Sequence, residues 1–168
     1  MIARSSILAV AALLWLPAKS AHAQDLEPNR ATLRGLASVF VAVEKLDPDS
    51  RYQGLDEGQI RLLAEARLRR AGIPIRSASE FEVSPDKSFL YIRLSAMRQG
   101  LCSAFSLSIA MRQEVVLVRD PDIGVVTETW SVGGVATAEP AKLKERATLA
   151  LNGYLDRFIA ARRSSAPK

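Results

Sequence analysis

The chain has 168 residues, of which 48% are hydrophobic and 24% are charged, and a formal net charge of +5. His22 and Cys102 are its only His and Cys, so an internal disulfide is excluded. If residues 1–23 are removed, no imidazole remains, which excludes Ser-His-Asp and Cys-His catalysis and the usual His-containing zinc sites.

Residues 1–23 have the features of a secretory signal peptide. Arg4 precedes an apolar run over residues 7–16, and the small-residue sequence Ala-His-Ala ends at Ala23. Pro17 and Lys19 interrupt the run after about ten residues, whereas a membrane-spanning helix needs about 20. We therefore expect cleavage after Ala23 and export to a bacterial periplasm, without a membrane-spanning segment.

The charge of the remaining chain is mild. Residues 1–23 hold two of the 23 Lys and Arg residues and none of the 18 acidic ones, which leaves a net charge of +3. A nucleic-acid partner is not expected, because such sites need clustered basic residues interleaved with aromatic ones. No cofactor or metal is expected either, since the Asp pairs at 47/49 and 120/122 lack the ligand spacing of a calcium loop.

The first half of the exported chain predicts a strand and a helix. Residues 24–32 are polar and aperiodic, which indicates a flexible leader before a single domain over 33–163 and a polar tail over 164–168. Residues 36–46 are apolar and rich in Val, as is typical of a strand. Asp56, with Gln59 three residues later, predicts the start of a helix that runs to about Ala71, where Gly72 and Pro74 end it.

The second half predicts hairpins and a closing helix. A short strand at 73–76 and a polar connection over 77–88 precede strands at 89–97, 105–118 and 125–132, the last two joined by a turn at 120–124. Apolar residues alternate regularly along the middle strand up to Met111. The alternation becomes ambiguous at 113–116, which indicates a β-bulge or a bend. Pro140 begins a helix to about Arg163.

The element order β-α-β-β-β-β-α predicts an α+β fold. We expect a two-layer sandwich, in which a mostly antiparallel four- or five-stranded sheet carries both helices on one face. The other face is then left to solvent or to a partner.

The candidate partner surface consists of Trp130, Glu128 and Arg112. Trp130 and Glu128 share a parity, so a regular strand would place them on one face. If that face is the core, Glu128 needs a partner; if it is the outside, Trp130 is exposed. Core packing of Trp130 against the last helix is the alternative to the surface interpretation. Cys102 is expected to be a half-buried strand residue and not a reactive thiol.

Several local phrases resemble a family of small secreted bacterial proteins of unknown function, over residues 36–161. They are Ala-Gly-Ile-Pro at 71–74, Leu-Tyr-Ile at 90–92, Val-Val-Leu-Val-Arg-Asp-Pro at 115–121 and Thr-Trp-Ser at 129–131. The element order is also similar to that of envelope lipoproteins of lipopolysaccharide assembly and of ABC-transporter auxiliary components, which carry a lipidated Cys that this chain lacks. The resemblance implies no catalytic residues.

These observations predict a non-enzymatic periplasmic binding or accessory protein, acting in envelope assembly or transport, with an envelope protein or lipid as its partner. No nucleophile elbow or phosphate-binding Gly loop is present in the sequence. Two alternatives stay open. One is a carboxylate-dependent hydrolase of envelope glycans, whose two acids can lie far apart in the chain. The other is a carrier of an apolar ligand, with an enclosed pocket between the helices and the sheet.

Overall fold

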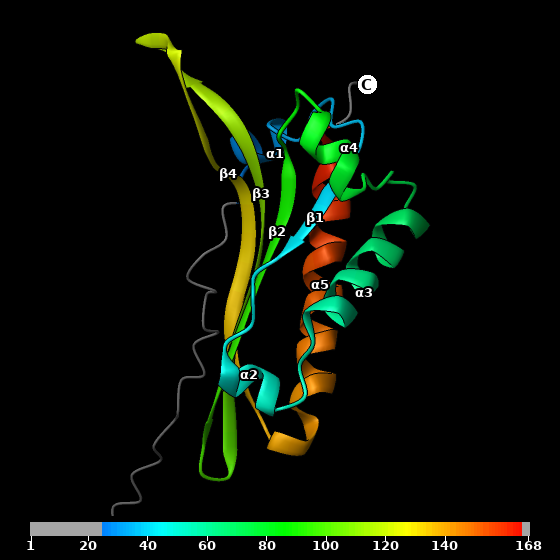
Figure 1. Cartoon of the computed structure of the whole chain (residues 1–168), viewed down its shortest axis with the longest axis vertical. Helices are drawn as coiled ribbons and strands as arrows, with labels where there is room; N and C mark the ends of the chain where they lie inside the picture. Colours follow the sequence, from blue (N-terminus) through cyan, green and yellow to red (C-terminus); the bar gives the residue numbers. More distant parts are fainter. Residues whose placement is uncertain (1–24, 166–168) are drawn as a thin grey trace, which may run out of the picture.

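A four-stranded mixed sheet, in the order β1-β2-β3-β4, forms the centre of the fold (Figure 1). The computed structural model describes residues 25–165. Its strands are β1 (Phe40–Val43), β2 (Phe89–Gln99), β3 (Cys102–Leu117) and β4 (Asp120–Ala138). β1 pairs in parallel with β2, and the other neighbours are antiparallel. The predicted α+β class is therefore confirmed, and the predicted signal peptide lies outside the described residues.

The two predicted helices correspond to α3 (Glu57–Arg70) and α5 (Leu143–Ser164). Both lie on the same face of the sheet (Figure 1). The side chain of Asp56 accepts a hydrogen bond from the Gln59 backbone N–H at 2.7 Å, which is the predicted N-cap of α3. Gly72 has a φ of 77°, a left-handed conformation that ends the helix as predicted.

Four short helical segments add to the predicted order. They are α1 (Glu27–Ala31), α2 (Pro48–Tyr52), α4 (Ala78–Val83) and the 3₁₀ turn η1 (Pro140–Lys142). α1 replaces part of the expected flexible leader, and α4 replaces part of the expected polar connection. α4 begins at a capping box between Ser77 and Glu80. Its Phe81 ring stacks on Phe40 at 4.6 Å, which covers part of the sheet face opposite α3 and α5.

The first strand is shorter than the expected 36–46, and the expected strand at 73–76 is reduced to one bridge. Val39 pairs with Ile75, with hydrogen bonds from the Val39 N–H to the Pro74 carbonyl and from the Arg76 N–H to the Val39 carbonyl. Pro74 has no N–H to donate, and within residues 25–165 this is the one bridge that forms at this edge of the sheet.

The core lies between the sheet and the helices α3 and α5. Leu94 pairs with Leu107 and Ile92 pairs with Ile109, so that one face of β2 and β3 presents a continuous apolar surface. Phe158 of α5 is fully buried with them. The predicted alternation of the middle strand is confirmed.

A bulge in β4 separates Trp130 from Glu128. Met111 pairs with Trp130 and Arg112 pairs with Glu128, which leaves Thr129 as an extra residue. The predicted irregularity is confirmed, although the ladder shifts twice, after Met111 and after Val116, and the extra residues belong to β4 in both cases. Beyond the bulge, the β3–β4 ribbon curves away from the helices (Figure 1). It turns at 118–119 instead of the expected 120–124.

Glu57, at the start of α3, holds the preceding segment in place through hydrogen bonds. Its carboxylate accepts hydrogen bonds from the Arg51 guanidinium and from the Leu46 backbone N–H, the latter at 3.0 Å. These bonds, with that of Arg51 first, lower the pKa of Glu57 from 4.5 to about 2. Because the folded-state pKa is depressed, the stabilisation is present above pH 4.5 and is lost as the pH falls toward 2.

We expect the Glu57→Gln variant to lose less stability than the parent protein between pH 5 and pH 3. Urea midpoints measured across this range test the prediction. Glu145→Gln on α5 is the matched control, because within residues 25–165 its exposed carboxylate has no hydrogen bond or ion pair. If the urea midpoints of Glu57→Gln and of the parent fell in parallel with pH, the stabilising role of the Glu57 carboxylate would be contradicted.

Candidate functional site

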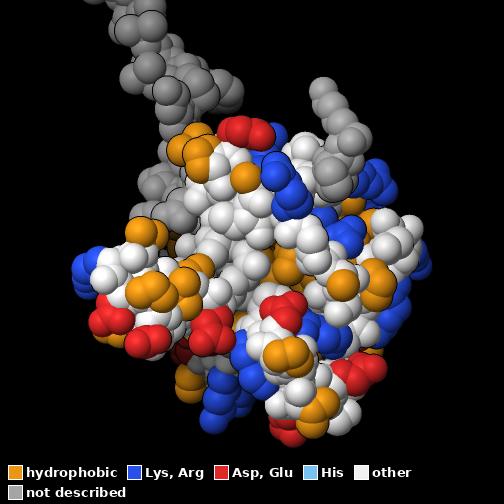
Figure 2. Space-filling view, turned by 90° about the horizontal axis from the view of Figure 1, so that it is seen from above, with side chains coloured by type: hydrophobic (Ala, Val, Ile, Leu, Met, Phe, Trp, Pro, Cys, Tyr) orange, Lys and Arg blue, Asp and Glu red, His pale blue; other side chains and the backbone are white. Residues whose placement is uncertain are grey.

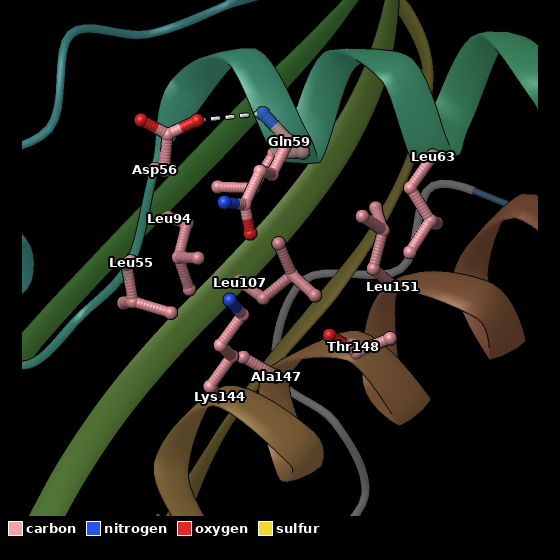
Figure 3. Close-up of a pocket in the computed structure, with 11 residues that line it drawn as sticks. Leu55, Asp56, Gln59, Leu63, Leu94, Leu107, Lys144, Ala147, Thr148 and Leu151 are labelled. Carbon is pink, nitrogen blue, oxygen red and sulfur yellow. Dashed lines mark hydrogen bonds between the residues drawn. The ribbon is translucent and has the colours of Figure 1, made fainter.

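A cavity of about 130 Å³ lies between α3, α5 and the sheet (Figure 3). Leu94 and Leu107, which face each other on β2 and β3, form its floor. The other apolar lining residues come from both helices and from the segment before α3; they are Leu55, Ile60, Leu63, Ala147 and Leu151. The cavity therefore interrupts the core where α3 and α5 begin.

Four polar side chains form the rim of this cavity: Asp56, Gln59, Lys144 and Thr148. In Figure 3 the side chains of Gln59 and Lys144 extend toward each other from opposite helices. The carboxylate of Asp56 caps α3, whereas Lys144 forms no ion pair or hydrogen bond within residues 25–165. The rim combines one cation, one carboxylate and two neutral hydrogen-bonding groups, so it suits a polar group of little net charge.

The size of the cavity limits what it can hold. An apolar cavity of about 150 Å³ in an engineered protein core takes up benzene. A cavity of about 130 Å³ therefore accommodates one small ring or the last few carbons of a single alkyl chain. An apolar lining under a polar rim is the usual composition of a small-molecule site.

Trp130 does not belong to a surface. Its side chain is 0% exposed, and its ring centroid lies 5.3 Å from that of Phe158. The indole N–H donates a hydrogen bond to Asp25 Oδ1 at 2.8 Å. The place of Trp130 in the candidate partner surface is therefore wrong, and core packing against the last helix is confirmed, because the bulge turns this residue toward the helices.

Asp25 joins this buried tryptophan to α1. Partial burial pushes the pKa of Asp25 upward, but hydrogen bonds from Arg30 and Trp130 outweigh it and leave the pKa below its usual range. Arg30 Nε donates to the same carboxylate at 2.7 Å. The segment expected as a flexible leader thus supplies the polar partner of the largest core side chain.

Arg112 and Glu128 do lie together, on the sheet face opposite α3 and α5. Their side chains form an ion pair at 3.3 Å, and the Arg112 guanidinium carbon lies 4.0 Å from the centre of the Tyr91 ring. Neither residue lines the cavity. Of the residues that do, Asp56 and Gln59 were predicted only as the start of a helix, and none was predicted to line a cavity.

Over residues 25–165, no group of three or more His, Cys, Asp or Glu side chains is placed to hold a metal ion. Cys102 is exposed at the start of β3, and not half-buried as expected. No helix within the same range combines the length and the hydropathy needed to span a membrane.

The fold and the cavity define an α+β protein with a small apolar pocket under a polar rim. No family model and no curated protein matches this chain. Two solved structures, the PelC dodecamer from Paraburkholderia phytofirmans and a point variant of it, are weakly similar, with TM-scores of 0.43 and 0.45. In both cases the identity is 19%, and the match covers 72% of this chain and 86% of the other.

Proposed function

We propose that this chain is an exported, non-enzymatic binding protein of the bacterial envelope, which takes the apolar end of an amphiphile into the cavity between α3, α5 and the sheet. The cavity itself carries the proposal: it is lined by leucines from α3, α5, β2 and β3 and has a polar rim. Export is inferred from residues 1–23. An envelope lipid is the kind of ligand that this compartment supplies, and a role in envelope assembly or transport would follow.

Simple energetics set the expected affinity. Burying a methylene contributes about 0.8 kcal/mol, so five carbons in the cavity contribute about 4 kcal/mol. This corresponds to a dissociation constant of about 1 mM. Tighter binding requires hydrogen bonds from the rim residues Gln59, Lys144 and Thr148, which would also hold the polar group of the ligand outside the apolar floor.

Binding has more support than hydrolysis. A glycosidase needs two carboxylates that flank the substrate, whereas Asp56 is the only acid among residues 25–165 that lines this cavity. Its carboxylate is already engaged as the N-cap of α3. The alternative of a protein partner on the open sheet face has less support, because Arg112 and Glu128 already pair with each other and Trp130 is buried.

We expect linear alcohols to bind at the cavity with a chain-length limit. Each added methylene should strengthen binding about fourfold up to about six carbons and have little effect thereafter. Changes in the NMR signals of the Leu107 and Leu151 methyl groups measure this binding. Mass spectrometry of organic extracts of the purified protein would then identify the natural amphiphile.

The control is a variant that fills the cavity. Ala147→Leu places extra carbons among the lining residues, so it should weaken hexanol binding at least about tenfold. Ala160→Leu, at an exposed position of the same helix, should leave binding unchanged. Leu63→Phe is a second filling variant in case Ala147→Leu folds poorly. Equal hexanol affinity in the parent and in folded filling variants would overturn the proposal.

A further inference from the structure

We infer that a second hollow, between the C-terminal halves of α3 and α5, binds a phosphate-type oxyanion. The hollow has a volume of about 240 Å³. Its lining residues are Arg67, Arg70 and Ala71 from the end of α3 and Asp156, Ile159 and Arg163 from α5. It shares no lining residue with the cavity of the proposed function, so the two sites are tested independently.

The charges in this hollow are not balanced. Arg67 pairs with Asp156, and its Nε donates to the carboxylate at 2.9 Å. Within residues 25–165, Arg70 and Arg163 form no ion pair or hydrogen bond. Three guanidinium groups thus face one carboxylate, which leaves a net charge of +2 in a concave site. Such a site concentrates anions more effectively than scattered surface charges do.

Helix dipoles explain only part of this arrangement. The negative ends of α3 and α5 favour cations in their last turns, which accounts for arginines at these positions. They do not provide partners for the N–H groups of Arg70 and Arg163. Seen from above, Lys and Arg side chains lie along the right-hand side of the molecule in Figure 2, the side on which α3 lies in Figure 1.

The chemistry of the lining selects the class of ligand. A guanidinium presents its N–H donors in a planar fork that matches two oxygens of a phosphate. Here the forks come from two helices, so a tetrahedral oxyanion can be held from two sides. The two negative charges of a phosphate monoester or of inorganic phosphate match the +2 of the hollow, and both a free phosphate and the monoester headgroup of phosphatidic acid have this chemistry.

Titration of the whole exported protein with inorganic phosphate at low ionic strength tests the inference. We expect saturable binding, followed by calorimetry, that weakens at least about tenfold in Arg70→Gln/Arg163→Gln, since each loses a charge-assisted contact. Arg69→Gln/Arg146→Gln is the matched control: it removes the same charge from the same two helices at exposed positions that do not line the hollow. This control should bind phosphate as the parent does.

Two further measurements separate the sources of the phosphate. Vesicles of phosphatidylcholine containing phosphatidic acid should bind the parent more strongly than Arg70→Gln/Arg163→Gln if the natural ligand is a lipid headgroup. Phosphate binding without vesicle binding would indicate a soluble phosphate compound. Absence of saturable phosphate binding, or equal losses in both double variants, would overturn the inference. Hexanol binding should be unchanged in both double variants, which keeps this test separate from that of the cavity.

Discussion

The Trp130→Ala variant is expected to lower the free energy of unfolding by about 3–5 kcal/mol. The ring is fully buried between β4 and α5, where it contacts Phe158. Its removal would leave a large void, and it would also leave the Asp25 carboxylate without the indole N–H that now donates to it at 2.8 Å. Both effects destabilise the folded state. The second also weakens the attachment of α1 to the core, because Asp25 connects the indole to Arg30 of this helix.

Urea unfolding followed by circular dichroism measures this loss. Tyr52→Ala is the control, since Tyr52 is 86% exposed and its truncation should change stability by less than about 0.5 kcal/mol. Trp130→Phe keeps an aromatic ring but removes the donor, so its smaller loss separates the hydrogen bond from ring packing. A loss below about 1 kcal/mol in Trp130→Ala would mean that the indole is not a core residue in solution.

The β4 bulge shows where sequence reasoning reached its limit. The mixed parity at 113–116 correctly indicated an irregular ladder, but it could not tell which strand holds the extra residue. The polar groups of Thr129 at the bulge find hydrogen-bond partners far away in the chain. Asn29 donates to the Thr129 carbonyl at 2.8 Å, and Gln113 donates to the Thr129 hydroxyl at 2.6 Å. Tertiary contacts of this kind leave no periodic signal in the chain.

Short sequence patterns predicted the helix whose ends depend on neighbouring residues in the chain. The cap at Asp56 and the left-handed Gly72 gave the bounds of α3 to within one residue. The capping box of Ser77 and Glu80 is also a local signal, and reading it would have predicted α4. α1 is different, because it makes contacts to residues about 100 positions away, such as the hydrogen bond from Asn29 to the Thr129 carbonyl.

The candidate site could not be predicted in the same way. A cavity is the space that α3, α5 and the sheet leave unfilled, and it depends on how three elements meet. Ala147 falls on the apolar stripe where a larger residue would also suit the helix pattern, so the sequence indicated a core position and not a gap. Arg67 and Arg70 of the second hollow were visible in the sequence, but their position opposite Asp156 and Arg163 of α5 was not.

The Gly133→Ala variant is expected to lower the free energy of unfolding by about 1–3 kcal/mol. Gly133 lies opposite Ser108 in the β3–β4 ladder. A Cβ atom at this position would lie 2.7 Å from the Cβ of Ser108 and 2.9 Å from the carbonyl oxygen of Leu107. Neither atom can rotate away, because one is fixed to the backbone and the other belongs to it. The two strands would therefore have to separate.

Gly153→Ala provides the opposite expectation from the same substitution. Gly153 lies in the middle of α5, and apart from its chain neighbours and the surrounding helix backbone no atom lies within 4 Å of where a Cβ atom would be, so alanine should stabilise the helix by about 0.5–1 kcal/mol. Urea unfolding of both variants measures the contrast, and a stability loss of equal size in both would contradict it. Because the Leu107 carbonyl lies beside Gly133 and the Leu107 side chain forms the cavity floor, Gly133→Ala should also weaken hexanol binding, whereas Gly153→Ala should not. This result would show that the close approach of β3 and β4 at Gly133 determines the shape of the cavity on the opposite face of the sheet.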